Sequence, residues 1–198
     1  MKRLPTVIGL LLLSALPALA QTGPDAMLYE LTEDVRLSAT HRMASSALGG
    51  FANPNTLLCP AALVSASGRC VVNAIGSNNI AFATGRGPVH GNYTIVTQDI
   101  NPFEIEELVR QRGAFRGEMD LSQTGVIFLG TMDGTMTVEQ RRVNVPFRGI
   151  VRIPVPCGDG VFCYVTSGAD GIPTGFVPLQ SFEFALGRPA VRLDIYFQ

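Results

Sequence analysis

Residues 113–121 read Gly-Ala-Phe-Arg-Gly-Glu-Met-Asp-Leu, with glycine or a large apolar residue at every second position. Residues 87–95 and 130–138 repeat this pattern, and residues 145–153 repeat it with Val145 in place of the first glycine. Successive side chains of a strand point to opposite faces. Each segment is therefore expected to form a strand with one apolar, glycine-rich face and one mostly polar face.

Glycine at every fourth position of an apolar strand face favours strong curvature, because it removes side chains from the concave side of a sheet. Short connections between the patterned segments predict antiparallel neighbours. We therefore expect an all-β protein, a strongly coiled, closed antiparallel barrel of about eight to ten strands. Leu121 is expected to pair with Val126, which would place Gly117 beside Gly130. This architecture is similar to that of lipocalins and allene oxide cyclases, although no sequence motif of either family is matched.

The rest of the chain is expected to add shorter strands and one irregular loop. Alternation of apolar and polar residues predicts these strands, over residues 27–31, 35–43, 57–64, 70–75, 80–84, 161–166, 176–186 and 191–197. Residues 44–56 are rich in small and turn-forming residues, which predicts the loop.

A single short helix is predicted near residues 102–109. Asn101 is a suitable N-cap, Pro102 suits the first helical position and Glu104 has the spacing of a capping box. Against the helix, Val109 already fits the alternation of the strand that follows.

The N-terminal twenty residues have the features of a cleaved export signal. Lys2 and Arg3 precede an apolar stretch, and Ala18-Leu19-Ala20 is a small-residue cleavage site. We expect residues 1–20 to be removed and residues 21–198 to form a single β-barrel domain, exported to the periplasm or beyond the cell.

The four cysteines are expected to form two disulfides, because disulfides persist in the oxidising compartments that exported proteins reach. Four cysteines allow three pairings. The local pairing, Cys59 with Cys70 and Cys157 with Cys163, is favoured because Gly158-Asp159-Gly160 is a turn sequence between the second pair. A zinc site is not expected, since there is no Cys-x-x-Cys spacing and the chain has only two histidines.

Charge argues against a nucleic-acid partner. With the first twenty residues removed, the chain has no lysine and its acidic residues outnumber its arginines by three. A nucleic-acid-binding protein needs a concentrated basic surface. The lysine-free composition, rich in Ala, Gly and Arg, indicates a bacterial origin.

No catalytic or cofactor motif is present. The chain lacks a nucleophile elbow, a His-Glu-x-x-His sequence and a phosphate-binding loop, so no cofactor is expected. Alternation aims His90 at the polar face. His41 falls in phase with apolar neighbours, either as a core histidine or as the centre of an unrecognised enzyme with a carboxylate such as Asp99 or Glu183.

The apolar face of the patterned strands is the candidate ligand-binding surface. It is rich in methionine and aromatic residues, which suit adaptable apolar pockets. Its proposed members are Tyr93, Phe115, Met119, Met132, Met136 and Phe147. The alternative is that these side chains only fill the barrel interior.

Three classes of function remain open from the sequence. The leading one is an exported soluble barrel that binds a small apolar ligand or acts as an interaction module. An outer-membrane barrel is the second, although the absence of tryptophan and the presence of disulfides count against it. An enzyme of unrecognised type is the third. The oligomeric state is left open.

Overall fold

A computed structural model of the 198-residue chain describes residues 23–63, 68–101, 104–122, 129–138, 143–179 and 191–198. The expected signal, Glu183 and much of the candidate strand at 176–186 lie outside these ranges. Among the described residues, no helix is long and apolar enough to cross a membrane.

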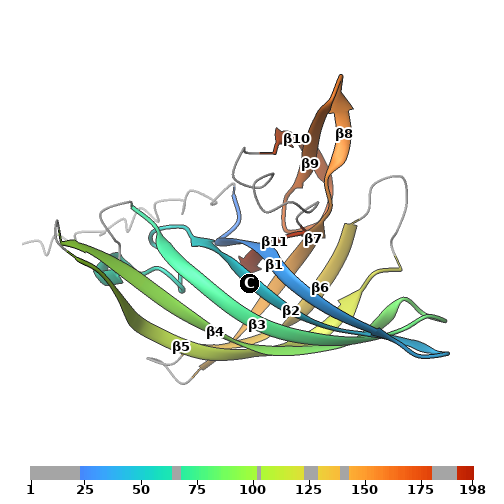
Figure 1. Ribbon diagram of the computed structural model, residues 1–198, viewed down its shortest axis with the longest axis horizontal. Helices are drawn as coiled ribbons and strands as arrows, with labels where there is room; N and C mark the ends of the chain where they lie inside the picture. The colour runs from blue at the N-terminus through green and yellow to red at the C-terminus, as the bar shows by residue number, and fades with distance from the viewer. Residues whose placement is uncertain (1–22, 64–67, 102–103, 123–128, 139–142, 180–190) are drawn as a thin grey trace, which may run out of the picture.

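Eight strands form a closed antiparallel barrel, which confirms the expected fold class (Figure 1). Around the barrel the order is β1-β11-β7-β6-β5-β4-β3-β2. The strands are β1 (Ala26–Leu37), β2 (His41–Ala52), β3 (Cys70–Ala81), β4 (Arg86–Asn101), β5 (Glu104–Asp120), β6 (Leu129–Val138), β7 (Val143–Arg152) and β11 (Arg192–Phe197).

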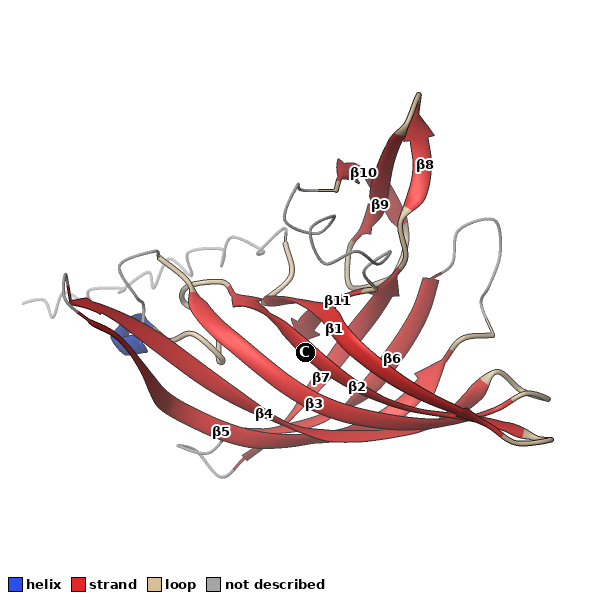
Figure 2. Ribbon diagram, in the orientation of Figure 1, coloured by secondary structure: helices blue, strands red, loops and turns tan. Residues whose placement is uncertain are grey.

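A second, three-stranded sheet is inserted between β7 and β11 in the sequence. It consists of β8 (Val155–Gly158), β9 (Val161–Ser167) and β10 (Pro173–Pro178), in the order β10-β9-β8. This sheet projects away from the barrel beside β7 (Figure 2). Its inner residues Tyr164 and Val165 are buried, while much of β10 is exposed.

The predicted helix near 102–109 is wrong, because β5 begins at Glu104 and is extended throughout. Its pairing with β4 continues from Asp120 opposite Arg86 to Glu104 opposite Asn101, with one irregularity at Ile95/Val96. The helix prediction rested on local capping signals, which contribute about 0.5–2 kcal/mol. A continuous ladder to a neighbouring strand satisfies the same backbone groups along the whole segment and outweighs them.

The N-terminal strands also differ from expectation. Residues 35–43 span the end of β1, a turn and the start of β2, and residues 44–52 are strand rather than loop. The segment 57–64 contains a short 3-10 helix at Ala61–Leu63 instead of a strand. The small residues of this segment predicted a loop, but in β2 they allow close contact between neighbouring strands. A Cβ on Gly50, for example, would lie only 2.0 Å from the Met27 carbonyl oxygen.

At two of the repeated glycines, the backbone of the neighbouring strand leaves no room for a side chain. Gly117 is opposite Gly134, four residues away from the predicted partner Gly130. A Cβ at Gly117 would lie 2.2 Å from the Asp133 carbonyl oxygen, and one at Gly134 would lie 2.3 Å from that of Arg116. A shift by an even number of residues keeps the same face inward. The interior position of the glycine face is therefore as expected, although the register is not.

Both predicted disulfides are present. Cys59 and Cys70, with Cα atoms 5.5 Å apart, join the β2–β3 connection to the start of β3, and both are fully buried. Leu58 precedes this bridge and packs in the barrel core, so the connection closes one end of the barrel. Cys157 and Cys163, with Cα atoms 5.8 Å apart, link β8 to β9 in the outer sheet.

Candidate functional site

A cavity of about 350 Å³ occupies the barrel interior on the side of the β1–β2 and β3–β4 turns. A volume of this size lies within the range of small-molecule sites. Its wall is mainly apolar over β5, β6, β7 and β11. The apolar lining residues are Leu48, Val89, Phe115, Met119, Leu121, Met132, Val151, Ile153, Val191 and Leu193.

Three of the six predicted ligand-binding residues line this cavity: Phe115, Met119 and Met132. Met119 is partly buried, whereas Phe115 and Met132 are buried and also belong to the packed core. Register explains why the two methionines meet, since Met119 lies directly opposite Met132 on β5 and β6.

The other three predicted residues lie deeper or elsewhere in the core. Tyr93 and Met136, together with Phe115, border a second space of only about 20 Å³. This part of the barrel interior is therefore close to filled. Phe147 is 1% exposed and is packed in the core, away from the lining of either space. The predicted face is thus part cavity wall and part core.

Tyr93 is held in place by two hydrogen bonds. Its hydroxyl donates to the Thr137 carbonyl oxygen (2.9 Å) and accepts from Nε2 of Gln111 (3.2 Å). Gln111 is 2% exposed, so its amide would be costly to leave without a partner. These hydrogen bonds hold the Tyr93 side chain in the packed core, so we assign it a structural role.

A polar wall, which the sequence analysis missed, faces the apolar side of the cavity. It consists of Glu30, Glu33, Arg42, Ser46 and Asn78, on β1, β2 and β3. The Ser46 hydroxyl donates to Oε1 of Glu30 (2.7 Å). The Arg42 guanidinium forms an ion pair with Glu33 and donates to Oδ1 of Asn78 (3.4 Å).

The polar wall was missed because a β-bulge changes which residues point inward. The β1–β2 register shifts between Glu30 and Thr32, so Glu30 and Glu33 both line the interior although three positions separate them. Arg42 was expected on the polar outer side for a different reason: the pattern of residues 35–43 predicts one strand, whereas β1 ends at Leu37 and β2 begins at His41. The side chains of Glu33 and Arg42 are 25% and 28% exposed, so the cavity reaches solvent beside them.

Neither histidine is part of this site. Nδ1 of His41 lies 2.7 Å from the Thr40 hydroxyl at the β1–β2 turn. Nε2 of His90 lies 3.1 Å from the Ser77 hydroxyl, with His90 exposed. Among the described residues, no group of three or more His, Cys, Asp or Glu side chains could hold a metal ion.

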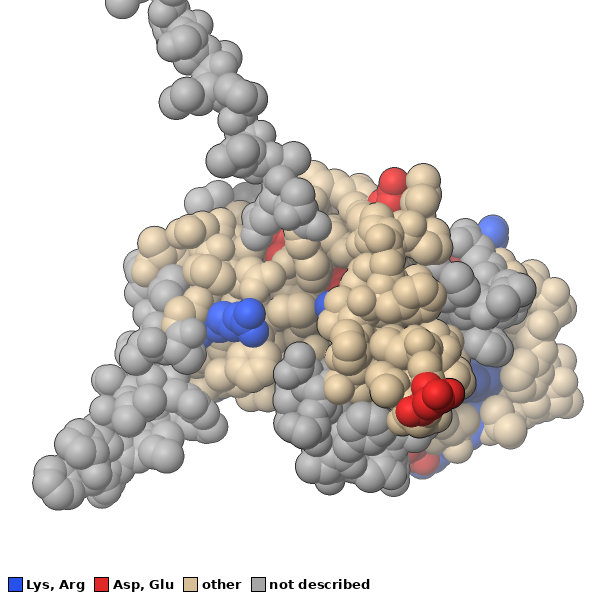
Figure 3. All heavy atoms as spheres, turned by 90° about the horizontal axis from the view of Figure 1, so that it is seen from above, with Lys and Arg blue, Asp and Glu red and all other residues tan. Residues whose placement is uncertain are grey.

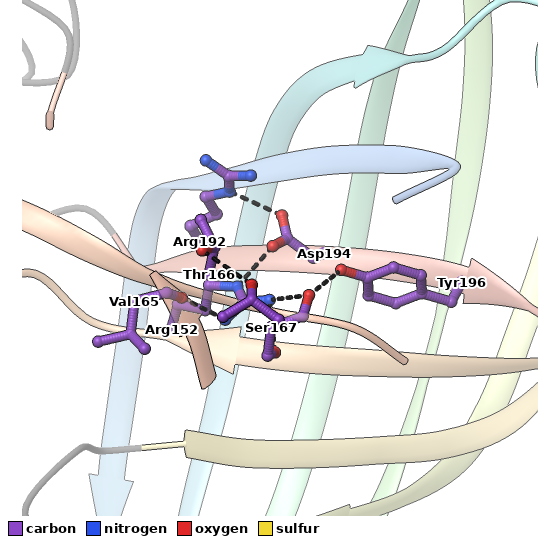
Figure 4. A network of polar contacts seen from close by, with 8 residues as sticks. Arg152, Val165, Thr166, Ser167, Arg192, Asp194 and Tyr196 are labelled. Carbon is purple, nitrogen blue, oxygen red and sulfur yellow. Dashed lines mark hydrogen bonds and ion pairs between the residues drawn. The ribbon is translucent and has the colours of Figure 1, made fainter. Parts of the chain in front are cut away.

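A buried charged network lies on the opposite, outer face of β7 and β11, beneath the small sheet (Figure 4). The Arg152 guanidinium donates to Asp194 (2.5 Å), to the Ser167 hydroxyl (2.8 Å) and to the Val165 carbonyl oxygen. Arg192 donates to the other oxygen of Asp194 (2.6 Å). The network attaches β9 to the barrel.

Three tyrosines lie beside this network. The Arg192 guanidinium lies near the rings of both Tyr29 and Tyr164, at 6.0 and 5.6 Å from their centroids, which are 6.4 Å apart. The Tyr196 hydroxyl donates to the Ser167 carbonyl oxygen (2.8 Å). Burial, and secondarily the charge of Asp194, raise the pKa of Tyr196 above its ordinary value because both disfavour the phenolate.

Charged side chains are sparse on the face of the molecule that carries the small sheet (Figure 3). The small sheet itself exposes large apolar side chains. These are Val161, Phe162, Phe176 and Val177, with Ile172 in the turn before β10.

The fold and the site together define an eight-stranded antiparallel β-barrel with an internal cavity and an outer sheet that is hydrogen-bonded to a buried ion-pair network of the barrel. Comparison of the chain with protein-family models, curated proteins and solved structures finds no match.

Proposed function

We propose that this protein is an exported, water-soluble barrel that binds a small, mainly apolar ligand in its interior cavity. The observation that carries the proposal is the cavity itself, about 350 Å³ bordered by Phe115, Met119 and Met132. A barrel whose interior served only as a core would be filled to close-packed density. The deeper half of this barrel is filled in that way, and the half with the polar wall is not.

On β5, the distribution of polarity supports a water-facing exterior, whereas β1, β2 and β3 also expose apolar side chains such as Leu37, Met43 and Ile75. The outward residues of β5 include Arg112, Arg116 and Glu118, which are exposed, while Phe115 and Met132 point inward. An outer-membrane barrel has the opposite arrangement, with an apolar band outside and a polar interior. Two disulfides support an oxidising compartment, in agreement with the export signal expected from the sequence.

An interaction module is the second candidate, favoured by the exposed apolar residues of the small sheet. Phe176 and Ile172 are 61% and 63% exposed. Large exposed apolar side chains gathered on one small sheet often mark a contact with a partner. Ligand binding and partner binding use different parts of the molecule, so one does not exclude the other.

The cavity is tested with a neutral naphthylamine dye whose fluorescence rises in apolar surroundings. We expect saturable binding to the wild-type protein and none to Met119→Trp, because the larger ring would fill the partly open cavity. Ile75→Trp, at a 70%-exposed position on the barrel, is the matched control and should bind as the wild type does. Failure of the wild type to bind, or equal binding by Met119→Trp, would contradict the proposed function.

A further inference from the structure

The cavity has two chemically distinct sides. Glu30, Ser46 and Asn78 represent its polar side, on the adjacent strands β1, β2 and β3. Met119 and Leu193 represent the apolar side, on β5 and β11. A wholly apolar ligand would place apolar groups against these polar side chains, whereas an amphiphile would match both sides.

The charge of the polar wall selects the kind of polar group. Glu30, Glu33 and Arg42 are the charged residues among the described lining, so the formal charge of the wall is −1. Arg42 already donates to Glu33 and Asn78. An anionic group placed near Arg42 would therefore also lie near two carboxylates, and like charges in an interface are unfavourable.

The hydrogen-bonding groups of the polar wall also favour a positively charged donor. An ionised carboxylate has two oxygens that only accept and can each take more than one donor. An ammonium group offers up to three donors and a positive charge. Partial burial of Glu33, whose side chain is 25% exposed, makes such a charge-assisted contact stronger than one at an open surface.

We propose that the ligand is an amphiphilic amine, whose protonated nitrogen lies against Glu30 and Glu33 and whose apolar part lies against Met119, Met132 and Leu193. This inference rests on the proposed function, because it assigns a chemical class to the occupant of the same cavity. It differs from that function in predicting a preference among ligands of equal apolar size.

The test compares decylammonium, decanol and decanoate, which share one alkyl chain, by calorimetric titration of the mature protein at neutral pH. We expect the ammonium to bind most tightly and the carboxylate most weakly, with at least about a tenfold difference between them, equivalent to ~1.4 kcal/mol. Glu30→Gln should weaken decylammonium about tenfold, in line with loss of a hydrogen bond to a charged group. Its affinity for decanol should be unchanged. Glu118→Gln, on the outer face of β5, is the control and should change neither affinity.

A double variant tests the charge of the whole polar wall, so that the conclusion does not depend on Glu30 alone. Glu30→Gln combined with Glu33→Gln turns the formal charge of the wall from −1 to +1, and should make decanoate bind more tightly than decylammonium. Circular dichroism of each variant verifies folding, and Glu30→Gln alone decides the matter if the double variant does not fold. Decanol binding with no preference for the ammonium would overturn the amine inference and leave the proposed function standing. Absence of binding by all three amphiphiles and by the neutral dye would overturn both.

Discussion

Asp194 is the shared counter-charge of the buried network through which Arg152 holds β9 to the barrel. It is 1% exposed and accepts hydrogen bonds from two guanidinium groups, those of Arg152 and Arg192. Buried ion pairs add little net stability over apolar packing, but removal of one partner leaves an uncompensated buried charge. The free energy of unfolding is therefore expected to fall sharply when one charged partner of the network is removed, even though the intact network adds little net stability.

We predict that Asp194→Asn lowers the free energy of unfolding by about 3–5 kcal/mol, because two buried guanidinium groups lose their counter-charge. Asp133→Asn is the control, since Asp133 is 57% exposed and pairs with Arg148 at the barrel surface. Its loss should cost about 0–1 kcal/mol. Urea unfolding monitored by circular dichroism measures both. Equal effects of the two substitutions would show that the buried network is not critical.

At the scale of the strand, the inward glycines allow the backbones of the paired strands β5 and β6 to lie close together. Gly117 and Gly134 face each other, and a side chain on either would meet backbone atoms of the neighbouring strand rather than a movable side chain. Backbone cannot shift without disturbing the ladder. The glycines therefore have a steric role in barrel closure, beyond their effect on local strand flexibility.

Gly117→Ala is expected to destabilise the barrel by about 1–3 kcal/mol, the usual cost of forcing extra atoms into a packed site. The matched control is Gly158→Ala in β8, where the nearest atom to an added Cβ is Cβ of Val161 at 3.9 Å. That variant should retain the wild-type midpoint of urea unfolding. A wild-type midpoint for Gly117→Ala would contradict the steric role.

At the scale of the whole molecule, the barrel is closed and packed at one end and hollow at the other. Leu58 and the Cys59–Cys70 bridge close the packed end. The polar wall marks the hollow end. Met132 lies between the two regions, since it borders both the main cavity and the small space beneath it and is 3% exposed.

Because of this position, Met132→Trp should both block the neutral dye and lower the free energy of unfolding by about 1–3 kcal/mol through overpacking. Met119→Trp, one strand away and partly buried, should block the dye with a smaller loss of stability. Thermal unfolding of the two variants beside wild type makes the comparison. If Met132→Trp leaves stability unchanged, the cavity extends deeper than the structure indicates.

Much of the architecture was predictable from local pattern. A period of two with inward glycines in residues 87–95, 113–121 and 130–138 specifies curved antiparallel strands, because alternation determines which face is buried. The turn sequence Gly158-Asp159-Gly160 indicated the pairing of Cys157 with Cys163, which the structure contains. These features are encoded by residues close together in the chain.

Tertiary structure decided the features that depend on distant partners. Residues 104–109 carry helix-start signals but are extended, because β4 offers them a ladder. The bulge after Glu30 and the closure of β1 against β11 bring Glu30 and Glu33 into the cavity opposite Met119. The buried Arg152–Asp194 pair joins strands 42 residues apart. Sequence alone determined the fold class and the inward face of the glycine-patterned strands, since these depend on neighbours along the chain. Register, the polar wall and the boundary between core and cavity depend on how the closed barrel brings strands together, so only the folded structure determined them.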